Sequence, residues 1–398
     1  MVTKQRNNAL IIHLARKKEN MSRILLVSTS YPVAGEGEAA AGTFVRDFAL
    51  ALVEQGHQVE VIAPAQYVGR TQVAESLIEN YFHAPRLPLS LLSPKKISDW
   101  PVILRTLRNG SNAVENACSN RRPDHIFALW TLPCGAWAKH SGKRHKIPYS
   151  TWALGSDIWS LGKIPVIRQL LITTLRQAKF RFADGHQLAA EVKMLAGVDC
   201  QFLPSSRKFA GNPLRKRAET PPYRFAFLGR WHVNKGIDIL LEALQQLDEA
   251  VWPKIEAIRI CGGGPLEESV QRSVGALRSM GRPVELNSYL DLAAAQALFE
   301  WTDFVLIPSR IESIPVVFSD ALQSKRPVIA TPVGDLAQLI NSLQCGTLAD
   351  KPTPAAFAQA IRQACEIPNQ SLAQGLVTGA IAFDIDQAAQ TFMKTIQR

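Results

Sequence analysis

The sequence lacks the marks of a membrane-spanning protein and of a protein held together by disulfides or zinc. It contains no run of about 18 consecutive apolar residues, the length that a transmembrane helix needs. Its six cysteines are scattered with no close pair, which argues against both a disulfide framework and a zinc site. This cysteine usage is typical of a reducing compartment, so we expect a cytoplasmic protein.

Acidic residues are scarce in the first half of the chain. Residues 1–210 contain 27 Lys and Arg against 15 Asp and Glu, whereas residues 211–398 contain 18 against 19. The net charge of +11 therefore comes from the N-terminal half alone. Such a one-sided field indicates an acidic partner, an anionic membrane surface or an acidic glycan, with an ordinary basic surface as the alternative. No recognised nucleic-acid motif accompanies the charge, so we expect no nucleic-acid partner.

The length of 398 residues is long for one domain and natural for two. Strand and helix patterns alternate in both halves, which predicts an α/β fold with doubly wound parallel sheets. Residues 1–20 are basic and weakly patterned, and we interpret them as a disordered extension, with a helix lying on a membrane surface as the alternative. We divide the rest into a first Rossmann-like domain (21–206), a linker (207–222), a second Rossmann-like domain (223–380) and a terminal helix (381–398).

The most informative stretch has the order strand, loop, helix, strand. Apolar runs at 304–307 and 327–330 predict buried strands, and 315–324 has helical spacing between them. This crossover builds parallel sheets. Glu312 falls in the loop at the carboxyl end of the first strand, and Asp320 falls in the helix. Because open α/β sheets bind ligands at that edge, we expect both carboxylates to face a ligand there.

Arg230 and Lys235 lie in a predicted strand-to-helix loop, with Lys235 at the helix start. Backbone donors and the positive end of the helix dipole favour phosphate at such a position. Two cations five positions apart are suited to neutralise a diphosphate without a metal. Alone, this pattern also fits two ordinary surface cations. The nearby run Gly262-Gly-Gly-Pro265 and the two acids downstream favour the phosphate-binding interpretation.

A metal-dependent reaction would require an Asp-x-Asp at a strand end. The sequence contains Asp384-Ile-Asp386, but this pair opens the terminal helix, where acids cap the helix dipole. We therefore expect no metal and no other cofactor. A Gly-x-Gly-x-x-Ala match at 35–40 fits a dinucleotide fingerprint only superficially, because its loop is too long and carries two glutamates.

These motifs together resemble the family 4 glycosyltransferases. The resemblance rests on Pro-Ser309, on Glu312 with an acid eight positions later, on the Ala-Leu helix and on Pro327-Val-Ile-Ala-Thr. It extends to Gly155-Ser-Asp157-Ile after a first-domain strand. The chain departs from the family pattern at three places, where the sequence has Asp320 instead of Glu, Lys325-Arg326 before Pro327, and Leu154 instead of His or Arg.

The resemblance implies a GT-B fold, in which two Rossmann-like domains face across a cleft and the terminal helix crosses back to the first domain. It implies that Arg230 and Lys235 hold the donor diphosphate, that Glu312 contacts the donor sugar and that Asp320 contacts the ribose. Asp157 would face the acceptor side, although a turn or helix cap is an alternative role for it. The implied catalytic residues are Glu312, Arg230, Lys235 and Asp157. The implied donor-binding residues are Gly42, Gly229, Arg230, Lys235, Gly263, Gly264, Pro265, Ser309, Glu312, Ser313, Ile314, Pro315, Val316 and Asp320.

We therefore expect a retaining, metal-independent transferase of the hexosyl type. Its donor would be a UDP- or GDP-linked sugar, and its acceptor a glycan or a polyprenyl-linked glycan in cell-envelope polysaccharide synthesis. The basic first domain would contact the anionic inner face of the plasma membrane. Two alternatives stay open: an inactive subunit that binds a nucleotide sugar or a partner, and a sugar-nucleotide epimerase on the same fold.

Overall fold

The structure of the protein is a computed structural model that describes residues 21–33, 42–87, 89, 92–93, 96–208 and 216–398. The predicted extension and the match at 35–40 lie outside the described residues. No helix in the described ranges is long and apolar enough to cross a membrane. The chain divides into two compact units. Unit 1 comprises Met1–Ala183, Ala189–Leu203 and Ala388–Arg398, and unit 2 comprises Asp184–Leu188 and Pro204–Gln387.

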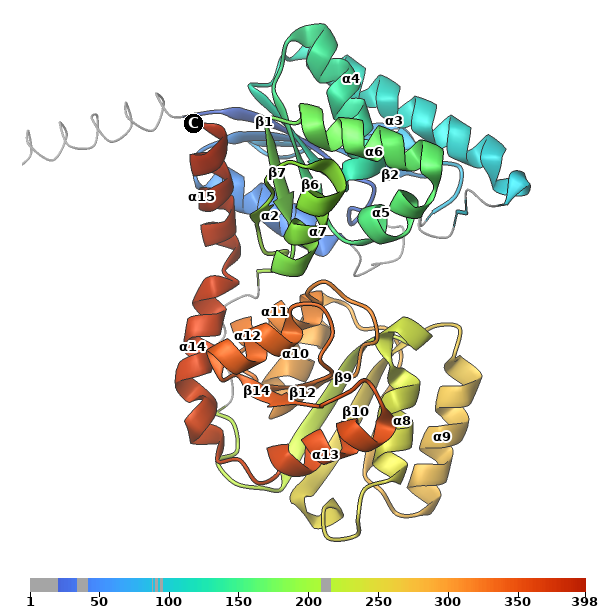
Figure 1. The fold of residues 1–398 in the computed structure, drawn as a ribbon, viewed down its shortest axis with the longest axis vertical. Coiled ribbons are helices and arrows are strands. Elements are labelled where there is room, and N and C mark those ends of the chain that lie inside the picture. Colours follow the sequence, from blue (N-terminus) through green and yellow to red (C-terminus); the bar gives the residue numbers. More distant parts are fainter. Residues whose placement is uncertain (1–20, 34–41, 88, 90–91, 94–95, 209–215) are drawn as a thin grey trace, which may run out of the picture. The chain divides into compact units, whose positions relative to one another are not determined.

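Unit 1 is built on an eight-stranded sheet with the order β3-β4-β2-β1-β5-β6-β7-β8 (Figure 1). Neighbouring strands are parallel, except that β3 and β4 pair antiparallel. All five residues of both β5 and β6 are buried, as expected for parallel strands covered on both faces. The strands are β1 (Arg23–Val27), β2 (Gln58–Ala65), β3 (Gly69–Ala74), β4 (Leu77–His83), β5 (His125–Leu129), β6 (Tyr149–Ala153), β7 (Phe180–Ala183) and β8 (Gln201–Phe202).

Unit 2 contains a six-stranded sheet, all parallel, with the order β11-β10-β9-β12-β13-β14. The strand order reverses direction at β9, beside β12, and such a switch point is where open α/β sheets bind ligands. The predicted strand at 304–307 is confirmed as β12. The strands are β9 (Tyr223–Arg230), β10 (Ile255–Gly263), β11 (Val284–Asn287), β12 (Phe304–Ile307), β13 (Val328–Ala330) and β14 (Gly346–Leu348).

Helices connect the parallel strands and cover both faces of each sheet, so the predicted α/β fold with two doubly wound, Rossmann-like domains is confirmed (Figure 1). The α-helices are α2 (Thr43–Glu54), α3 (Trp100–Asn120), α4 (Ala136–His145), α5 (Ser156–Trp159), α6 (Pro165–Gln177), α7 (His186–Ala196), α8 (Ile237–Gln245), α9 (Glu267–Ser279), α10 (Leu292–Trp301), α11 (Val316–Gln323), α12 (Leu336–Leu343), α13 (Pro354–Ala364), α14 (Ala373–Ala382) and α15 (Ile385–Ile396). The short helical turns are η2 (Ile97–Asp99), η3 (Thr131–Gly135), η4 (Leu161–Lys163), η5 (Val233–Lys235), η6 (Trp252–Lys254) and η7 (Asn369–Leu372).

The end of the chain contributes to the core of unit 1. Phe392, on the part of α15 that belongs to this unit, stacks on Phe127 of β5 with ring centroids 4.2 Å apart. Its ring also contacts Phe48 and Phe182, each at a centroid distance of 5.7 Å. Since Phe392 is completely buried, this helix end is an integral part of the aromatic core and not an appendage.

Candidate active site

Two loops of unit 2 pack directly on each other at the carboxyl edge of the sheet. β9 and β12 are parallel neighbours, so the loops that follow them begin side by side. Gly236, at φ +67°, ends the loop after β9, and a Cβ there would lie 1.8 Å from the carbonyl oxygen of Pro308. Only glycine permits this approach and this conformation. The contact fixes the start of α8 against the loop after β12.

Lys235 and Glu312 form an ion pair across these two loops, from Nζ to Oε1. Lys235 ends the η5 turn, and Glu312 follows β12 by a few residues. The side chain of Glu312 is 16% exposed and that of Lys235 is 38% exposed. The structure therefore brings together the acid and one of the two cations that the sequence singled out, in a position that a ligand can reach from solvent.

Arg310, which belongs to no predicted motif, links the same two loops. Its guanidinium binds the carboxylate of Asp238 through two hydrogen bonds of 2.7 Å, in the bidentate geometry that Arg and carboxylates favour. It also donates to the carbonyl of Val233, and its backbone N–H donates to the carbonyl of Asn234, both at 2.8 Å. Burial raises the pKa of the Asp238 carboxyl, but the hydrogen bonds and charge of Arg310 outweigh that effect and lower it below its ordinary value.

Arg230 ends β9 and is exposed, beside the predicted glycine run. It pairs in register with Gly263 of β10, and Gly229 pairs with Gly262. A Cβ on Gly262 would lie 2.0 Å from the carbonyl oxygen of Gly229, so the two strand ends touch backbone to backbone. Gly264, at φ +146°, continues this close packing. Among the described residues Arg230 has no ion-pair partner, and its charge is available to an anion.

The loop from Ser309 to Pro315 has buried residues at both ends and exposed or half-buried residues in the middle, where the candidate acid lies. Ser309 and Ser313 are 3% and 6% exposed, and the Thr331 hydroxyl donates to the Ser309 carbonyl. Ile314 is also buried, Pro315 is the N-cap residue of α11 and Val316 is its first residue. A Cβ on Gly334 would lie 2.2 Å from the Ser313 carbonyl oxygen. These contacts attach the loop to the segment that follows β13. Pro265, another predicted donor-binding residue, lies in the turn before α9.

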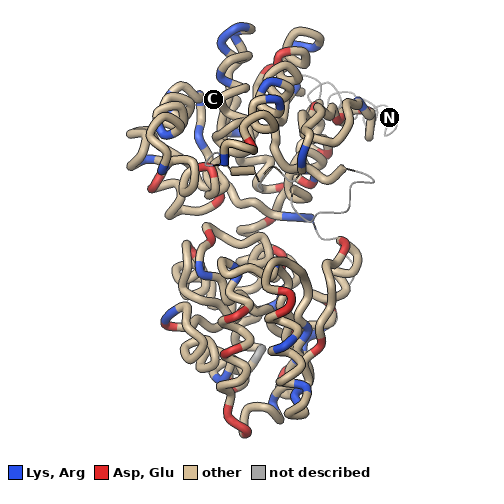
Figure 2. The backbone as a smooth tube through the Cα atoms, turned by 90° about the vertical axis from the view of Figure 1, so that its right-hand side faces the viewer, with Lys and Arg blue, Asp and Glu red and all other residues tan. Residues whose placement is uncertain are grey.

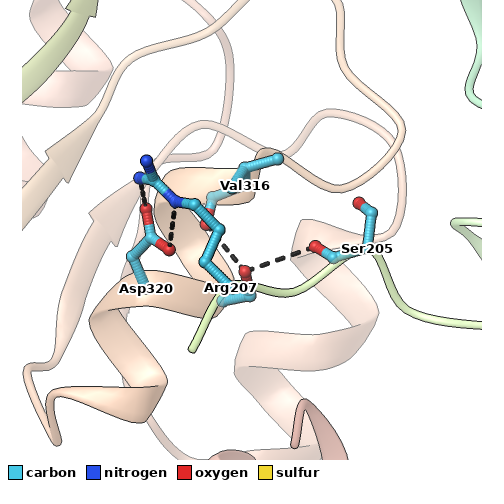
Figure 3. A network of polar contacts seen from close by, with 5 residues as sticks. Ser205, Arg207, Val316 and Asp320 are labelled. Atoms are coloured by element: carbon cyan, nitrogen blue, oxygen red, sulfur yellow. Dashed lines mark hydrogen bonds and ion pairs between the residues drawn. The ribbon is translucent and has the colours of Figure 1, made fainter. Parts of the chain in front are cut away.

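The expectation that the Asp320 carboxylate faces an open edge of the sheet is wrong. The side chain is fully buried and forms a bidentate ion pair with Arg207, which is 8% exposed (Figure 3). The distance from Nε of Arg207 to Oδ1 is 3.0 Å. Burial raises the pKa of Asp320, and the charge and hydrogen bonds of Arg207 oppose this shift.

Ser319 adds a second link between α11 and the segment that contains Arg207. Its hydroxyl lies 3.4 Å from the carbonyl oxygen of Ser205 and 2.8 Å from that of Val316 (Figure 3). All of these residues belong to unit 2. Residues 205–207, predicted as the end of the first domain and the start of the linker, are thus attached to the helix that follows the candidate site. No short-range sequence signal pointed to this contact.

The two candidates in unit 1 make contacts within this unit, and those of Asp157 fit the alternative role of a turn or helix cap. Asp157 is 1% exposed, and its carboxylate accepts hydrogen bonds from the backbone N–H groups of Thr131 at 2.6 Å and of Leu154 at 3.3 Å. Burial raises its pKa, and these hydrogen bonds oppose the shift. Gly42 is the N-cap residue of α2, at φ +97°, and a Cβ there would lie 2.6 Å from the backbone of Ser30. Both residues therefore shape loops of unit 1 itself.

The Asp-x-Asp at the start of α15 acts as a helix cap, as expected. The Asp384 carboxylate accepts a hydrogen bond of 2.8 Å from the backbone N–H of Gln387. Within the described ranges, His, Cys, Asp and Glu do not gather in groups of three or more that could hold a metal ion.

The part of the chain that carries the unit 2 candidates is similar to a known protein family. Residues 222–366 match the family described as Glycosyl transferases group 1. This segment of the group 1 domain contains every candidate from Gly229 to Asp320. Gly42 and Asp157 lie outside it, as does Arg207.

Curated relatives of the group 1 domain are glycosyltransferases, enzymes of class EC 2.4. A Bacillus subtilis protein whose name gives it as a candidate teichuronic acid biosynthesis glycosyltransferase, TuaC, is 31% identical over 255 residues. The match covers 60% of this chain and 60% of that protein. The chain therefore spans less than two thirds of the length of this relative.

Solved structures resemble almost the whole chain. A sucrose-phosphate synthase from Thermosynechococcus elongatus has a TM-score of 0.74 at 17% identity, covering 94% of this chain and 98% of the other. Anabaena Alr3699/HepE, in complex with UDP-glucose, has a TM-score of 0.63 at 15% identity, covering 94% of this chain and 99% of the other. At these identities the likeness establishes the fold, which is that of the GT-B glycosyltransferases.

Proposed function

We propose that this chain is a hexosyl-type glycosyltransferase that moves a sugar from a UDP- or GDP-linked donor to a glycan or polyprenyl-linked acceptor. The observation that carries the proposal is the ion pair of Lys235 and Glu312 at the sheet edge where β9 ends with the exposed Arg230. Two cations and one carboxylate are grouped at the edge where this fold binds ligands. The name of the Bacillus subtilis relative and the UDP-glucose bound by the Anabaena protein support a nucleotide-sugar donor.

The reaction separates charge, and the site has groups of both signs to stabilise it. The bond between the anomeric carbon and the diphosphate breaks, which leaves positive charge on the sugar ring and negative charge on the diphosphate. Arg230 and Lys235 stabilise the departing diphosphate, and Glu312 stabilises the sugar through its hydroxyls. The acceptor oxygen bonds to the same face of the ring, and its proton passes to the leaving phosphate oxygen. Configuration is retained as in family 4, without a covalent intermediate.

Binding of the donor requires an exchange of partners at Lys235. In the ligand-free protein its ammonium is neutralised by Glu312. A diphosphate carries more charge than one carboxylate, so it displaces Glu312 from Lys235 and leaves the carboxylate free to accept hydrogen bonds from the sugar. Arg310 and Asp238 hold the two loops in place during this exchange. The ion pair thus keeps the site ordered before the donor arrives.

The cations make a bound metal unnecessary in this scheme, and we propose a metal-independent transfer. We also propose that the enzyme works in cell-envelope polysaccharide synthesis at the inner face of a membrane, with the basic unit 1 against anionic lipid. Lys and Arg positions occur on several helices of unit 1 (Figure 2), which favours a broad electrostatic attraction over one anchoring helix.

The first experiment is a screen of nucleotide sugars for thermal stabilisation, followed by transfer assays with those that bind. A ligand at about 100 times its Kd adds about 2.7 kcal/mol to stability, which is readily measured. Lys235→Ala should reduce the stabilisation by the best donor to about 1.4 kcal/mol or less, because tenfold weaker binding leaves the ligand at about 10 times its Kd. Lys254→Ala is the matched control, because Lys254 forms an exposed ion pair with Glu366 elsewhere in unit 2. If no nucleotide or nucleotide sugar stabilises the wild-type protein, the proposal fails.

A second function is a subunit that binds a nucleotide sugar without transferring it. The burial of Asp320, expected at the ribose, and of Asp157, expected on the acceptor side, favours it, because both carboxylates are engaged within the protein. Donor binding with no hydrolysis or transfer in any acceptor mixture would support this function. An epimerase would instead convert the nucleotide sugar with no acceptor present.

A further inference from the structure

Three lysines line a pocket of unit 1. The pocket has a cavity volume of about 270 Å³, and its lining includes Lys139, Lys143 and Lys179. Tyr149 of its wall begins β6, and Lys179 precedes β7. The pocket therefore lies at the amino-terminal edge of the sheet. Asp157 and its loop follow β6 and lie at the opposite, carboxyl edge.

The positive charges of this pocket are not neutralised by the protein. No Asp or Glu contributes to its lining. The Lys139 ammonium lies 3.4 Å from the Thr173 hydroxyl, and the Lys179 ammonium lies 3.4 Å from the backbone carbonyl of Ile396. These partners are neutral, and within the described part of the chain none of the three lysines forms an ion pair. The pocket thus concentrates about three positive charges on one small surface.

Ordinary helix electrostatics explain only part of this arrangement. Lys143 lies in the last turn of α4, where a cation is stabilised by the helix dipole. Lys139 lies one turn earlier, and two like charges at i and i+4 destabilise a helix. Lys139 is also half-buried, and burial lowers the pKa of its ammonium, so its surroundings destabilise the charged form. A bound anion would relieve both effects.

We propose that this pocket binds a phosphate group with two or more negative charges, as found in a phosphate monoester or a diphosphate. Lysines bind phosphate as point charges with three donors each. The cavity volume of about 270 Å³ is large enough to hold such an anion. The site is separate from the proposed transfer reaction and does not depend on it.

Lysine footprinting of the whole protein with acetic anhydride tests the proposal residue by residue. Inorganic pyrophosphate should slow the acetylation of Lys139, Lys143 and Lys179, and it should leave Lys146 unchanged. Lys146 is exposed, adjoins α4 and does not line the pocket. Protection of Lys235 in the same sample would report the donor site separately, so failure at one site is distinguishable from failure at the other. No protection of the pocket lysines, or equal protection of Lys146, would overturn the proposal.

Vesicles distinguish a lipid-borne phosphate from a free one. Vesicles that contain phosphatidic acid, whose headgroup is a phosphate monoester, would support the site with a lipid headgroup as its source if they protect the three pocket lysines but not Lys146, and phosphatidylcholine vesicles should protect none of them. Protection that includes Lys146 would instead indicate diffuse attraction to the surface, which contradicts a pocket.

The affinity of the pocket is measured in an Arg230→Ala/Lys235→Ala background, so that pyrophosphate cannot bind at the donor site. Lys139→Gln or Lys179→Gln should each weaken pyrophosphate binding about tenfold, the effect of one charge-assisted hydrogen bond. Lys193→Gln removes an exposed lysine of unit 1 that is paired with Asp199, and it should change nothing. Equal affinity in all these proteins would overturn the proposal.

Discussion

Lys235 and Glu312 are 77 positions apart in the sequence and form an ion pair across two neighbouring strand ends of unit 2. Both side chains keep some exposure, so the pair is neither a buried structural link nor a fully solvated surface contact. Arg230, with no ion-pair partner among the described residues, lies on the same edge of the sheet. An anion that enters here meets one free cation and one cation that must change partner.

Arg310 should matter more for transfer than for stability. Arg310→Lys keeps the positive charge but loses the two-pronged contact with Asp238, so the loops of Lys235 and Glu312 should shift relative to each other. We expect kcat to fall about tenfold or more, because small misplacements of reacting groups are costly. The free energy of unfolding should change by less than about 1 kcal/mol, since both side chains are about a third exposed.

Arg362→Lys is the control for Arg310, because Arg362, which lies on α13, also forms an ion pair with an aspartate, Asp248. It should leave kcat unchanged. Equal kcat values for the Arg310→Lys and wild-type proteins would contradict the positioning role of Arg310.

Asp320 should be a stability residue of unit 2 and not a ligand contact. Asp320→Asn breaks a buried ion pair and should lower the free energy of unfolding by about 3–5 kcal/mol. Chemical denaturation of the ligand-free protein measures this loss. Glu366→Gln, which removes an exposed ion pair, should stay within about 0.5 kcal/mol of wild type.

The double variant Arg207→Met/Asp320→Leu separates the two roles of Asp320. It replaces the buried ion pair by apolar side chains, so it should recover most of the lost stability. The nucleotide affinity of the double variant should equal that of the wild-type protein. A stable double variant that no longer binds the nucleotide would show that Asp320 or Arg207 contacts the ligand.

The convergence of Lys235 and Glu312 could be predicted from the sequence, whereas the burial of Asp320 could not. Parallel strands place their carboxyl ends at one edge, so the order of strand, loop and helix patterns was enough to bring the two loops together. The partner of Asp320 is Arg207, which is 113 positions away and lies in a polar segment without periodicity. The role of Arg310 could not be predicted either, because an acid at a helix start, such as its partner Asp238, is common and indicates no particular partner.

The least legible region of the sequence was the stretch that contains β3, β4 and α3. β3 lies at the edge of the sheet, and its residues are exposed or half-buried. A strand without a buried face has no alternation of apolar and polar residues, so hydrophobic periodicity cannot predict it. A local cap was one of the roles predicted for Asp157, but nothing in the sequence indicated its hydrogen bond with the backbone N–H of Thr131, 26 positions away.

His125 should make unit 1 sensitive to acid. Burial and, secondarily, the charge of Lys179 lower its pKa to about 3 in the folded protein. The unfolded chain binds the proton near the ordinary value, about 6.5, so stability is full above that pH and is lost as the pH falls towards 3. At pH 5 the loss from this one residue should be about 2 kcal/mol. His125→Gln should reduce the difference in stability between pH 7 and pH 5, and an unchanged difference would contradict the burial of a neutral imidazole.

Removal of divalent metals should not affect transfer. The proposed charge compensation comes from Arg230 and Lys235, which do not depend on a metal. Transfer rates measured with and without EDTA, after dialysis against the chelator, should therefore agree. A loss of activity that added Mg²⁺ or Mn²⁺ restores would contradict this prediction.

The most direct test of the account compares nucleoside diphosphate binding and transfer in Lys235→Ala and Glu312→Ala. Glu312→Ala frees the Lys235 ammonium, so the diphosphate of the preferred donor should bind at least as tightly as to wild type, while transfer is abolished. Lys235→Ala should weaken the same binding about tenfold or more, the effect of losing one charge-assisted hydrogen bond. Calorimetry with each variant, and with Lys254→Ala as control, gives both affinities. Full transfer by Glu312→Ala, or wild-type affinity in Lys235→Ala, would contradict the account.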